Sequence, residues 1–195
     1  EPEGLTSAEC HPRHLAFTLS CLAELRTGLA ARGLPLQVMV GTLPQVFDTL
    51  QRQHRFTHLF SHEETGPGWT FERDKRVAAW CLERGVVWQQ FAQTGVVRRL
   101  RTRNGWAARW QRRMAAPEAP VPAGFAGIQS DLADLPSVAQ LGHPAPGDSQ
   151  AGGERAAWDT LHSFLQQRGA DYRRAISSPL TAQSGCSRLS PHLAF

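Results

Sequence analysis

Hydrophobic positions in the first half of the chain alternate between helical and strand spacing. Leucines three, four and seven residues apart predict an amphipathic helix over residues 14–32, which Gly33 ends. The same kind of spacing predicts a short helix capped by Thr42 and a longer one over residues 70–84, which ends at Gly85. The residues expected to face inward are Leu15, Leu22, Leu25 and Leu29 in the first helix, Val46, Phe47 and Leu50 in the second, and Val77, Trp80 and Cys81 in the third.

Three short runs of apolar and β-branched residues separate these helices. They cover residues 36–40, 57–60 and 86–88, and they read as short strands of a buried parallel sheet. Helices that alternate with such strands form right-handed crossover units, so the sequence predicts an α/β fold with a doubly wound parallel sheet. Ligands of such sheets bind beyond the carboxyl ends of the strands, where residues 61–66 (SHEETG) follow the second run.

The segment after the second predicted strand carries three ionisable groups, those of His62, Glu63 and Glu64. These side chains are candidates for an acid and a base at the end of the strand. The alternative is a structural loop that is capped locally and packs on a neighbouring domain. The residue types leave both interpretations open.

The second half of the chain begins with a change of composition. Prolines, alanines and glycines without an apolar period fill residues 117–153, which predicts a long connection. Helical spacing returns after Glu154 and stops at Gly169. The residues on its apolar face are Trp158, Leu161 and Leu165.

Composition excludes several classes of protein. Apolar residues make up 41% of the chain and charged residues 19%, as in a folded globular protein. No apolar stretch approaches the ~20 residues that span a bilayer. The four cysteines lie far apart without a C-x-x-C pair, which argues against a disulfide scaffold and predicts a cytoplasmic protein. Cys10, His11 and His14 lack a further ligand nearby, so we expect no metal site.

The net charge of +4 comes from arginine, because Lys75 is the one lysine among 21 basic residues. Arginines cluster over residues 98–113 with no carboxylate between them, which indicates either an anionic partner or a solvated helix face. Trp106 and Trp110 lie four residues apart in this segment, and we expect them to pack its helix against the sheet. The remaining tryptophans are also expected in the core rather than in an electron-transfer chain.

The most informative segment of the chain is residues 172–195, which contain the run GCSRLSP. Ser190 followed by Pro191 is typical of a helix start, with serine as the cap and proline in the first helical position. Gly185, Ser187 and Arg188 precede this start, so hydroxyl groups, a guanidinium group and free backbone N–H groups converge there. This combination suits a phosphate group. The alternative is an ordinary capped helix with Arg188 in a salt bridge.

Residues 186–195, CSRLSPHLAF, resemble the flavin-binding signature of the photolyase/cryptochrome family, commonly T-S-R-L-S-P-Y-L-x-F-G. Further segments resemble the same family in the same order along the chain. They are residues 1–3, 14–17, 61–66, 73–74 and 96–98, and Gly152, Gly153, Glu154, Trp158, Leu161, Phe164 and Tyr172. The resemblance covers almost the whole chain and implies a divergent, bacterial member of the family.

The resemblance also implies a set of cofactor-binding residues. In the family, the hydroxyl and backbone groups of this segment contact the FAD pyrophosphate, Arg188 helps to fix the loop, and Tyr172 lies beside the cofactor. Three departures stand out: Cys186 replaces a frequent threonine, His192 replaces a frequent tyrosine, and the loop over residues 179–187 is longer than usual. The residues that the resemblance assigns to FAD are Tyr172, Ser187, Arg188, Leu189 and Ser190.

By resemblance, residues 1–116 form an α/β antenna-type domain, residues 117–152 an interdomain linker, and residues 153–195 the beginning of a helical FAD-binding domain. The family's first strand is expected before Glu1. The tryptophan chain and the lesion cavity are expected after Phe195, so no catalytic residue is expected within the chain. The α/β domain of the family binds an antenna chromophore of folate, deazaflavin or lumazine type, for which the candidate residues are His62, Glu63 and Glu64.

The function that the resemblance implies is light-dependent DNA repair by a FAD-binding lyase. Excited reduced flavin transfers one electron to a pyrimidine dimer in damaged DNA, and the dimer then splits. The expected protein is monomeric and has no membrane partner. The alternative is a cryptochrome-type blue-light photoreceptor, which signals to a partner without repairing DNA. A third interpretation is that these residues alone are photochemically inactive, because the helical domain is incomplete.

Overall fold

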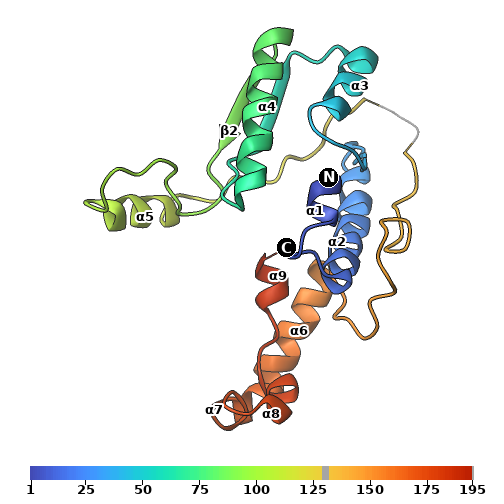
Figure 1. Cartoon of the computed structure of the whole chain (residues 1–195). Helices are drawn as coiled ribbons and strands as arrows, with labels where there is room; N and C mark the ends of the chain where they lie inside the picture. The colour runs from blue at the N-terminus through green and yellow to red at the C-terminus, as the bar shows by residue number, and fades with distance from the viewer. Residues whose placement is uncertain (129–131, 195) are drawn as a thin grey trace. The chain divides into compact units, whose positions relative to one another are not determined.

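The computed structural model describes residues 1–128 and 132–194, which divide into two compact units (Figure 1). Unit 1 comprises Glu1–Glu3 and Met39–Val121, and unit 2 comprises Gly4–Val38 and Pro122–Phe195. Unit 1 contains α3 (Gln45–His54), β1 (His58–His62), α4 (Gly68–Arg84), β2 (Val87–Phe91) and α5 (Trp106–Met114). Unit 2 contains α2 (Pro12–Ala30), α6 (Glu154–Gln166), the 3-10 helix η1 (Arg168–Asp171), α7 (Tyr172–Ala175), α8 (Pro179–Gly185) and α9 (Ser190–Ala194), and the short α1 (Pro2–Leu5) crosses the division.

Among the described residues, the sheet of unit 1 has two strands, β1 and β2, which run parallel. In their register His58 lies opposite Val87 and His62 opposite Phe91. The connection between the two strands is α4, which covers one face of the pair (Figure 1). This is the helical crossover that parallel strands require. The short apolar runs therefore predicted both strands, the alternation of helices with strands predicted their parallel pairing, and the fold class is α/β.

The core of unit 1 lies between α4 and the sheet. Val77, Trp80 and Cys81 are buried on one face of α4, as their helical spacing predicted, and Val86 completes the cluster. Partly buried neighbours packed against it are Leu43, Phe47, Phe56, Leu59 and Trp88. Gly85 ends α4 with a left-handed backbone (φ +65°), a conformation that favours glycine, and this turn brings the chain back into β2.

Two predictions about the start of unit 1 are wrong. Residues 36–40 are not a strand, because their backbone pairs with neither β1 nor β2 and the division between the units falls at Val38 and Met39. An apolar β-branched run becomes a strand only where a neighbouring strand offers donors and acceptors. Thr42 does not cap α3, which begins at Gln45 after Pro44 and has no side-chain cap.

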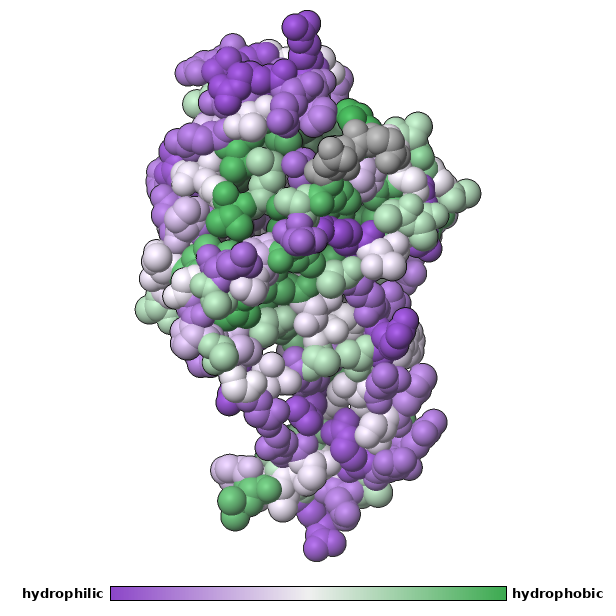
Figure 2. Space-filling model, turned by 90° about the vertical axis from the view of Figure 1, so that its right-hand side faces the viewer, coloured by the Kyte–Doolittle hydropathy of each residue, from purple (hydrophilic) through white to green (hydrophobic). Residues whose placement is uncertain are grey.

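The predicted burial of the tryptophans is correct for Trp80 and wrong for three others. Trp80 is 5% exposed, whereas Trp106 and Trp110 are 39% and 42% exposed, and α5 has no buried residue. The two rings instead face each other at 6.4 Å, and Trp106 donates to the Gly95 carbonyl at 3.2 Å. Trp158 on α6 is 52% exposed. Figure 2 shows that apolar residues reach the surface among hydrophilic ones on the face it presents.

Unit 2 is built on the pairing of α2 with the start of α6. The Gly153 amide donates to the Cys21 sulfur at 3.2 Å, and the Arg155 amide donates to Glu24 at 3.1 Å. Gly153 has a φ of +108°, so this approach depends on glycine. The described residues of the proline-rich connection, 117–128 and 132–152, form neither helix nor strand. The described helices include none that is long and apolar enough to cross a membrane.

Candidate functional site

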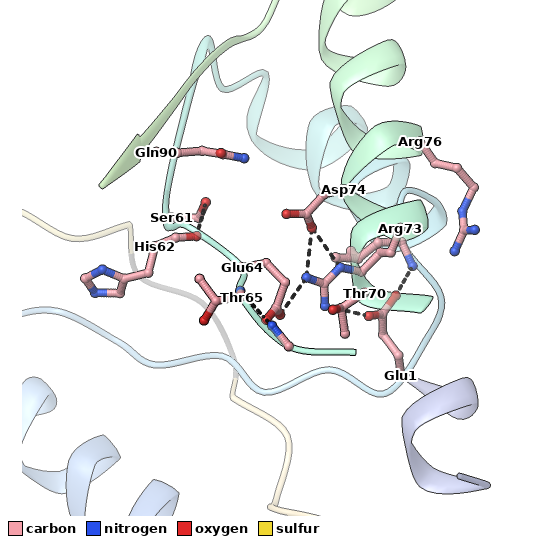
Figure 3. Close-up of polar contacts among 12 residues, drawn as sticks. Glu1, Ser61, His62, Glu64, Thr65, Thr70, Arg73, Asp74, Arg76 and Gln90 are labelled. Carbon is pink, nitrogen blue, oxygen red and sulfur yellow. Dashed lines mark hydrogen bonds and ion pairs between the residues drawn. The ribbon is translucent and has the colours of Figure 1, made fainter. Parts of the chain in front are cut away.

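A cluster of charged residues occupies the carboxyl end of β1 in unit 1 (Figure 3). Arg73, on the first turns of α4, forms ion pairs with three carboxylates: Glu1 at 3.1 Å, Glu64 at 3.1 Å and Asp74 at 2.8 Å. The side chains are largely shielded, since Arg73 is 17% exposed and Asp74 10%. We call these four residues the Arg73 cluster.

Glu64 holds its own loop as well as Arg73. One of its carboxylate oxygens accepts hydrogen bonds from the amides of Thr65 and Gly66 at 2.9 and 2.7 Å, and the other pairs with Arg73. Burial acts to raise the pKa of Glu64, but the Gly66 amide, Arg73 and the Thr65 amide outweigh it, so the pKa lies below its usual value. Glu64 is therefore an ionised bracing residue rather than a proton donor at neutral pH.

The lowered pKa of Glu64 predicts how the stability of unit 1 depends on pH. The unfolded chain protonates this carboxyl near its usual value of 4.5, whereas the folded chain protonates it at a lower pH. Its contribution to stability is thus complete above that value and is lost as the pH falls through the folded pKa. We expect the free energy of unfolding to fall less steeply in Glu64→Gln than in the wild type between about pH 5 and pH 3. Urea denaturation, followed by tryptophan fluorescence, measures this; parallel curves for the two proteins would contradict it.

The other two residues singled out at this end of the sheet lie differently. His62 is the last residue of β1 and is exposed, and its side chain points away from Arg73 in Figure 3. The Glu63 amide continues the strand pairing by donating to the Phe91 carbonyl at 2.8 Å. The contacts of Glu64 fit the structural, locally capped loop that was one of the two interpretations of this segment. The side chain of His62 takes no part in these contacts.

The second candidate site, in unit 2, is the segment 186–190 before α9. This helix begins at Ser190, one residue earlier than expected, because the Leu189 carbonyl already accepts the first helical hydrogen bond, from the Leu193 amide at 3.1 Å. Arg188 has a left-handed backbone with a φ of 60°. Ser187 and Leu189 are half-buried, whereas Arg188 and Ser190 are exposed.

Two side chains hold the backbone of this segment. Arg168 donates to the carbonyl oxygens of Cys186 and Ser187, and Gln150 donates to the Arg188 carbonyl at 2.9 Å. The Gln150 amide nitrogen also lies 2.9 Å from Nε2 of His192. Burial lowers the pKa of His192, so its ring is neutral at pH 7 and accepts this hydrogen bond.

A cavity of about 740 Å³ adjoins the segment, a size typical of small-molecule sites. Arg188 and Ser190 line it together with Arg13 and His14 from α2, and Asp148 is the one carboxylate on its wall among the described residues. Guanidinium, imidazole and hydroxyl groups suit the pyrophosphate of a dinucleotide. The donors present therefore fit FAD.

The structure does not bring all the predicted cofactor residues to this cavity. Among the described residues, its lining includes Arg188 and Ser190 but not Ser187 or Leu189, which present their backbone nearby. Tyr172 begins α7 and packs edge-on against Phe164, with ring centroids 5.7 Å apart, and it does not line the cavity.

Sequence reasoning missed four residues of the site in unit 2. Arg13 was not considered for the cavity, and His14 was weighed only as a metal ligand. Gln150 lies in the proline-rich connection, for which the sequence predicted neither helix nor strand. Arg168 lies at a helix end, where a basic residue is common and does not indicate a site. The described residues contain no group of three or more His, Cys, Asp or Glu side chains that could hold a metal ion.

Comparison with known proteins identifies the family. The family model for DNA photolyase matches residues 2–113, more than half of the chain. The chain belongs to the DNA photolyase family. The matched residues include the Arg73 cluster apart from Glu1, so that cluster lies within the part of the chain common to the DNA photolyases.

Curated relatives agree with this assignment at low identity. The deoxyribodipyrimidine photo-lyase of Synechococcus sp. is 25% identical over 215 residues, which is 100% of this chain and 44% of the relative. The enzyme of the same name from Halobacterium salinarum is 29% identical over 204 residues, which is 96% of this chain and 42% of the relative. The chain thus spans less than half the length of these photolyases.

Solved photolyase structures share the fold. A bacterial class III photolyase from Agrobacterium tumefaciens matches with a TM-score of 0.68 and 20% identity, covering 97% of this chain and 42% of its own. An archaeal photolyase from Sulfolobus tokodaii with two FAD molecules matches with a TM-score of 0.61 and 20% identity, covering 98% and 43%. At this identity the likeness shows the fold alone.

Proposed function

We propose that the protein is a light-dependent DNA-repair enzyme of the photolyase family, which binds FAD and splits pyrimidine dimers in damaged DNA. The observation that carries the proposal is the cationic cavity of unit 2. Four of its lining residues belong to the segment that resembles the family's flavin-binding signature: Arg188, Ser190, Pro191 and Ala194. The curated relatives are named deoxyribodipyrimidine photo-lyase, and the Sulfolobus tokodaii structure contains two FAD molecules.

The residues around the cavity supply binding rather than bond cleavage. Arg188 and Arg13 offer guanidinium forks to the two phosphates of FAD, and the Ser190 hydroxyl donates a further hydrogen bond. Asp148, the one carboxylate among the described lining residues, would repel a phosphate. FAD, when bound, supplies the light-driven electron transfer that splits the dimer.

An antenna chromophore in unit 1 belongs to the same proposal. The expected candidates were His62, Glu63 and Glu64, and of these the exposed His62 is the one whose side chain faces solvent beyond β1. Glu64 shapes the same loop through its contacts with Arg73 and the Gly66 amide. The predicted division into residues 1–116, 117–152 and 153–195, the cytoplasmic location and the monomeric state stay predictions.

Retention of FAD tests the proposed site directly. We expect the wild-type chain, incubated with FAD and passed through gel filtration, to keep visible flavin absorbance. The double variant Arg188→Gln/Ser190→Ala should lose FAD affinity by about tenfold or more, because it removes one charge-assisted and one neutral hydrogen bond. The matched control is Arg173→Gln/Ser177→Ala, which makes the same changes at exposed positions outside the cavity. A colourless wild-type protein, or equal losses in both double variants, would remove the basis of the proposal.

The reaction is tested with an oligonucleotide that contains a pyrimidine dimer. Under reducing conditions with FAD, blue light should convert the dimer to intact bases, whereas the dark control should leave it unchanged. Light-dependent reduction of bound flavin without loss of the dimer would contradict repair by these residues and would leave the signalling photoreceptor as the alternative.

A further inference from the structure

The guanidinium group of Arg168 donates hydrogen bonds to four different residues. Its Nε donates to the Ser163 hydroxyl at 3.0 Å, and one terminal nitrogen donates to the Thr160 carbonyl at 2.9 Å and the Ser187 carbonyl at 3.3 Å. The other terminal nitrogen donates to the Cys186 carbonyl. The guanidinium also lies 5.8 Å from the centre of the Phe164 ring. One side chain thus ties α6 to the segment 186–190.

Together with Gln150, this side chain fixes three consecutive carbonyl groups. Arg168 holds those of Cys186 and Ser187, and Gln150 holds that of Arg188. In a trans peptide the C=O and the N–H of the following residue point in opposite directions. The amides of Ser187, Arg188 and Leu189 therefore point away from the groups that hold the carbonyls.

These three amides have no acceptor among the residues that the structure describes. Consecutive backbone N–H groups around a left-handed residue, here Arg188 with a φ of 60°, form a concave anion-binding arrangement. Arg188 also lines the cavity of about 740 Å³ whose donors fit a pyrophosphate. The geometry therefore joins a fixed backbone segment to the proposed flavin site.

We propose that Arg168 and Gln150 are positioning residues for the pyrophosphate of the dinucleotide, which they serve by holding the carbonyls of residues 186–188 so that the following amides face the ligand. This inference rests on the proposed flavin site and adds two residues that hold the loop: Arg168, which is not among the lining residues of the cavity, and Gln150, which lines the cavity and also holds the Arg188 carbonyl. It requires arginine at position 168, because a guanidinium group donates to several carbonyls at once and an ammonium group on a flexible stem does not hold the same fork.

The test compares Arg168→Gln, Arg168→Lys and Gln150→Ala with the control Arg173→Gln, whose side chain is exposed on α7. FAD and inorganic pyrophosphate are titrated separately into the full 195-residue chain. Both Arg168 variants and Gln150→Ala should raise the Kd of either ligand by about tenfold or more, whereas Arg173→Gln should bind as the wild type does. The melting temperature of each ligand-free variant shows whether that variant folds. If Arg168→Gln does not fold, Arg168→Lys carries the comparison, because Arg168 is not among the lining residues of the cavity whereas Gln150 is.

A spectroscopic readout separates positioning from general stabilisation. In the isotope-labelled wild type, pyrophosphate should shift the amide resonances of Ser187, Arg188 and Leu189, and these shifts should be lost in Arg168→Gln. Wild-type affinity in Arg168→Lys would overturn the inference, since charge alone would then suffice. Unchanged amide shifts in a folded Arg168→Gln would overturn it as well. If the wild type binds neither FAD nor pyrophosphate, the proposed site and this inference fail together; if it binds both and the variants do too, the inference alone fails.

Discussion

Trp80→Ala is expected to lower the free energy of unfolding of unit 1 by about 3–5 kcal/mol. Trp80 is 5% exposed, and its ring lies 5.7 Å from the ring of Phe47 and 6.0 Å from that of Phe56. Its indole N–H donates to Asp48 at 2.9 Å. Truncation opens a cavity between α4 and α3 and removes a hydrogen bond, and neither loss is recovered by relaxation of a close-packed cluster.

Urea denaturation measures this loss, with circular dichroism and the remaining tryptophan fluorescence as signals. Leu82→Ala is the matched control, because Leu82 lies on the same helix and is 85% exposed. We expect it to change stability by no more than about 0.5 kcal/mol. Similar losses in the two variants would show that α4 does not pack as described.

Arg73→Met should destabilise unit 1 by about 2–3 kcal/mol at neutral pH. Methionine keeps much of the apolar stem and removes the guanidinium group, which leaves the carboxylates of Glu1, Glu64 and Asp74 close together without a cation. A half-buried carboxylate without a partner loses solvation that its ion pair had replaced. The figure is smaller than for a fully buried pair because the Glu64 side chain is 29% exposed.

The pH dependence of the Arg73→Met effect identifies its cause. Protonation removes the repulsion among the three carboxylates, so the difference from the wild type should shrink as the pH falls from about 7 to about 4. Arg76→Met is the control, since Arg76 pairs with Glu3 at 3.6 Å in an exposed position, and we expect a loss below about 0.5 kcal/mol. A difference that stays constant with pH would attribute the loss to packing instead of charge.

The Arg73 cluster supports one of the two interpretations that the sequence left open for the strand end. The side chains of His62, Glu63 and Glu64 are types that transfer protons, and they follow a parallel strand, but a locally capped structural loop was the alternative. The structure gives the Glu64 carboxylate three donors and a lowered pKa, and it leaves His62 exposed without joining the cluster. The nearest partner in space, Arg73, was in the sequence motif that carried the family resemblance, but its connection to Glu64 was not predicted.

Local patterns were sufficient for the parts of the fold that depend on near neighbours. The spacing of Val77, Trp80 and Cys81 predicted the buried face of α4, and Gly85 predicted its end. The two short apolar runs around Leu59 and Trp88 predicted β1 and β2. The run 36–40 is also short and apolar but forms no strand. A strand needs a neighbouring strand to pair with, and the β propensity of its residues does not supply one.

Residue types and their spacing predicted the helices of unit 1, the positions of β1 and β2, the proline-rich run and, through the CSRLSPHLAF segment, the resemblance to the photolyase family. Each of these depends on residue types and spacing within about one or two turns of the chain. Two contacts between distant residues became visible with the folded chain: Arg73 pairs with Glu1, 72 residues away, and Gln150 donates to the Arg188 carbonyl, 38 residues away. Contacts at such separations are selected by packing and by the need to satisfy buried polar groups, which a local pattern does not record.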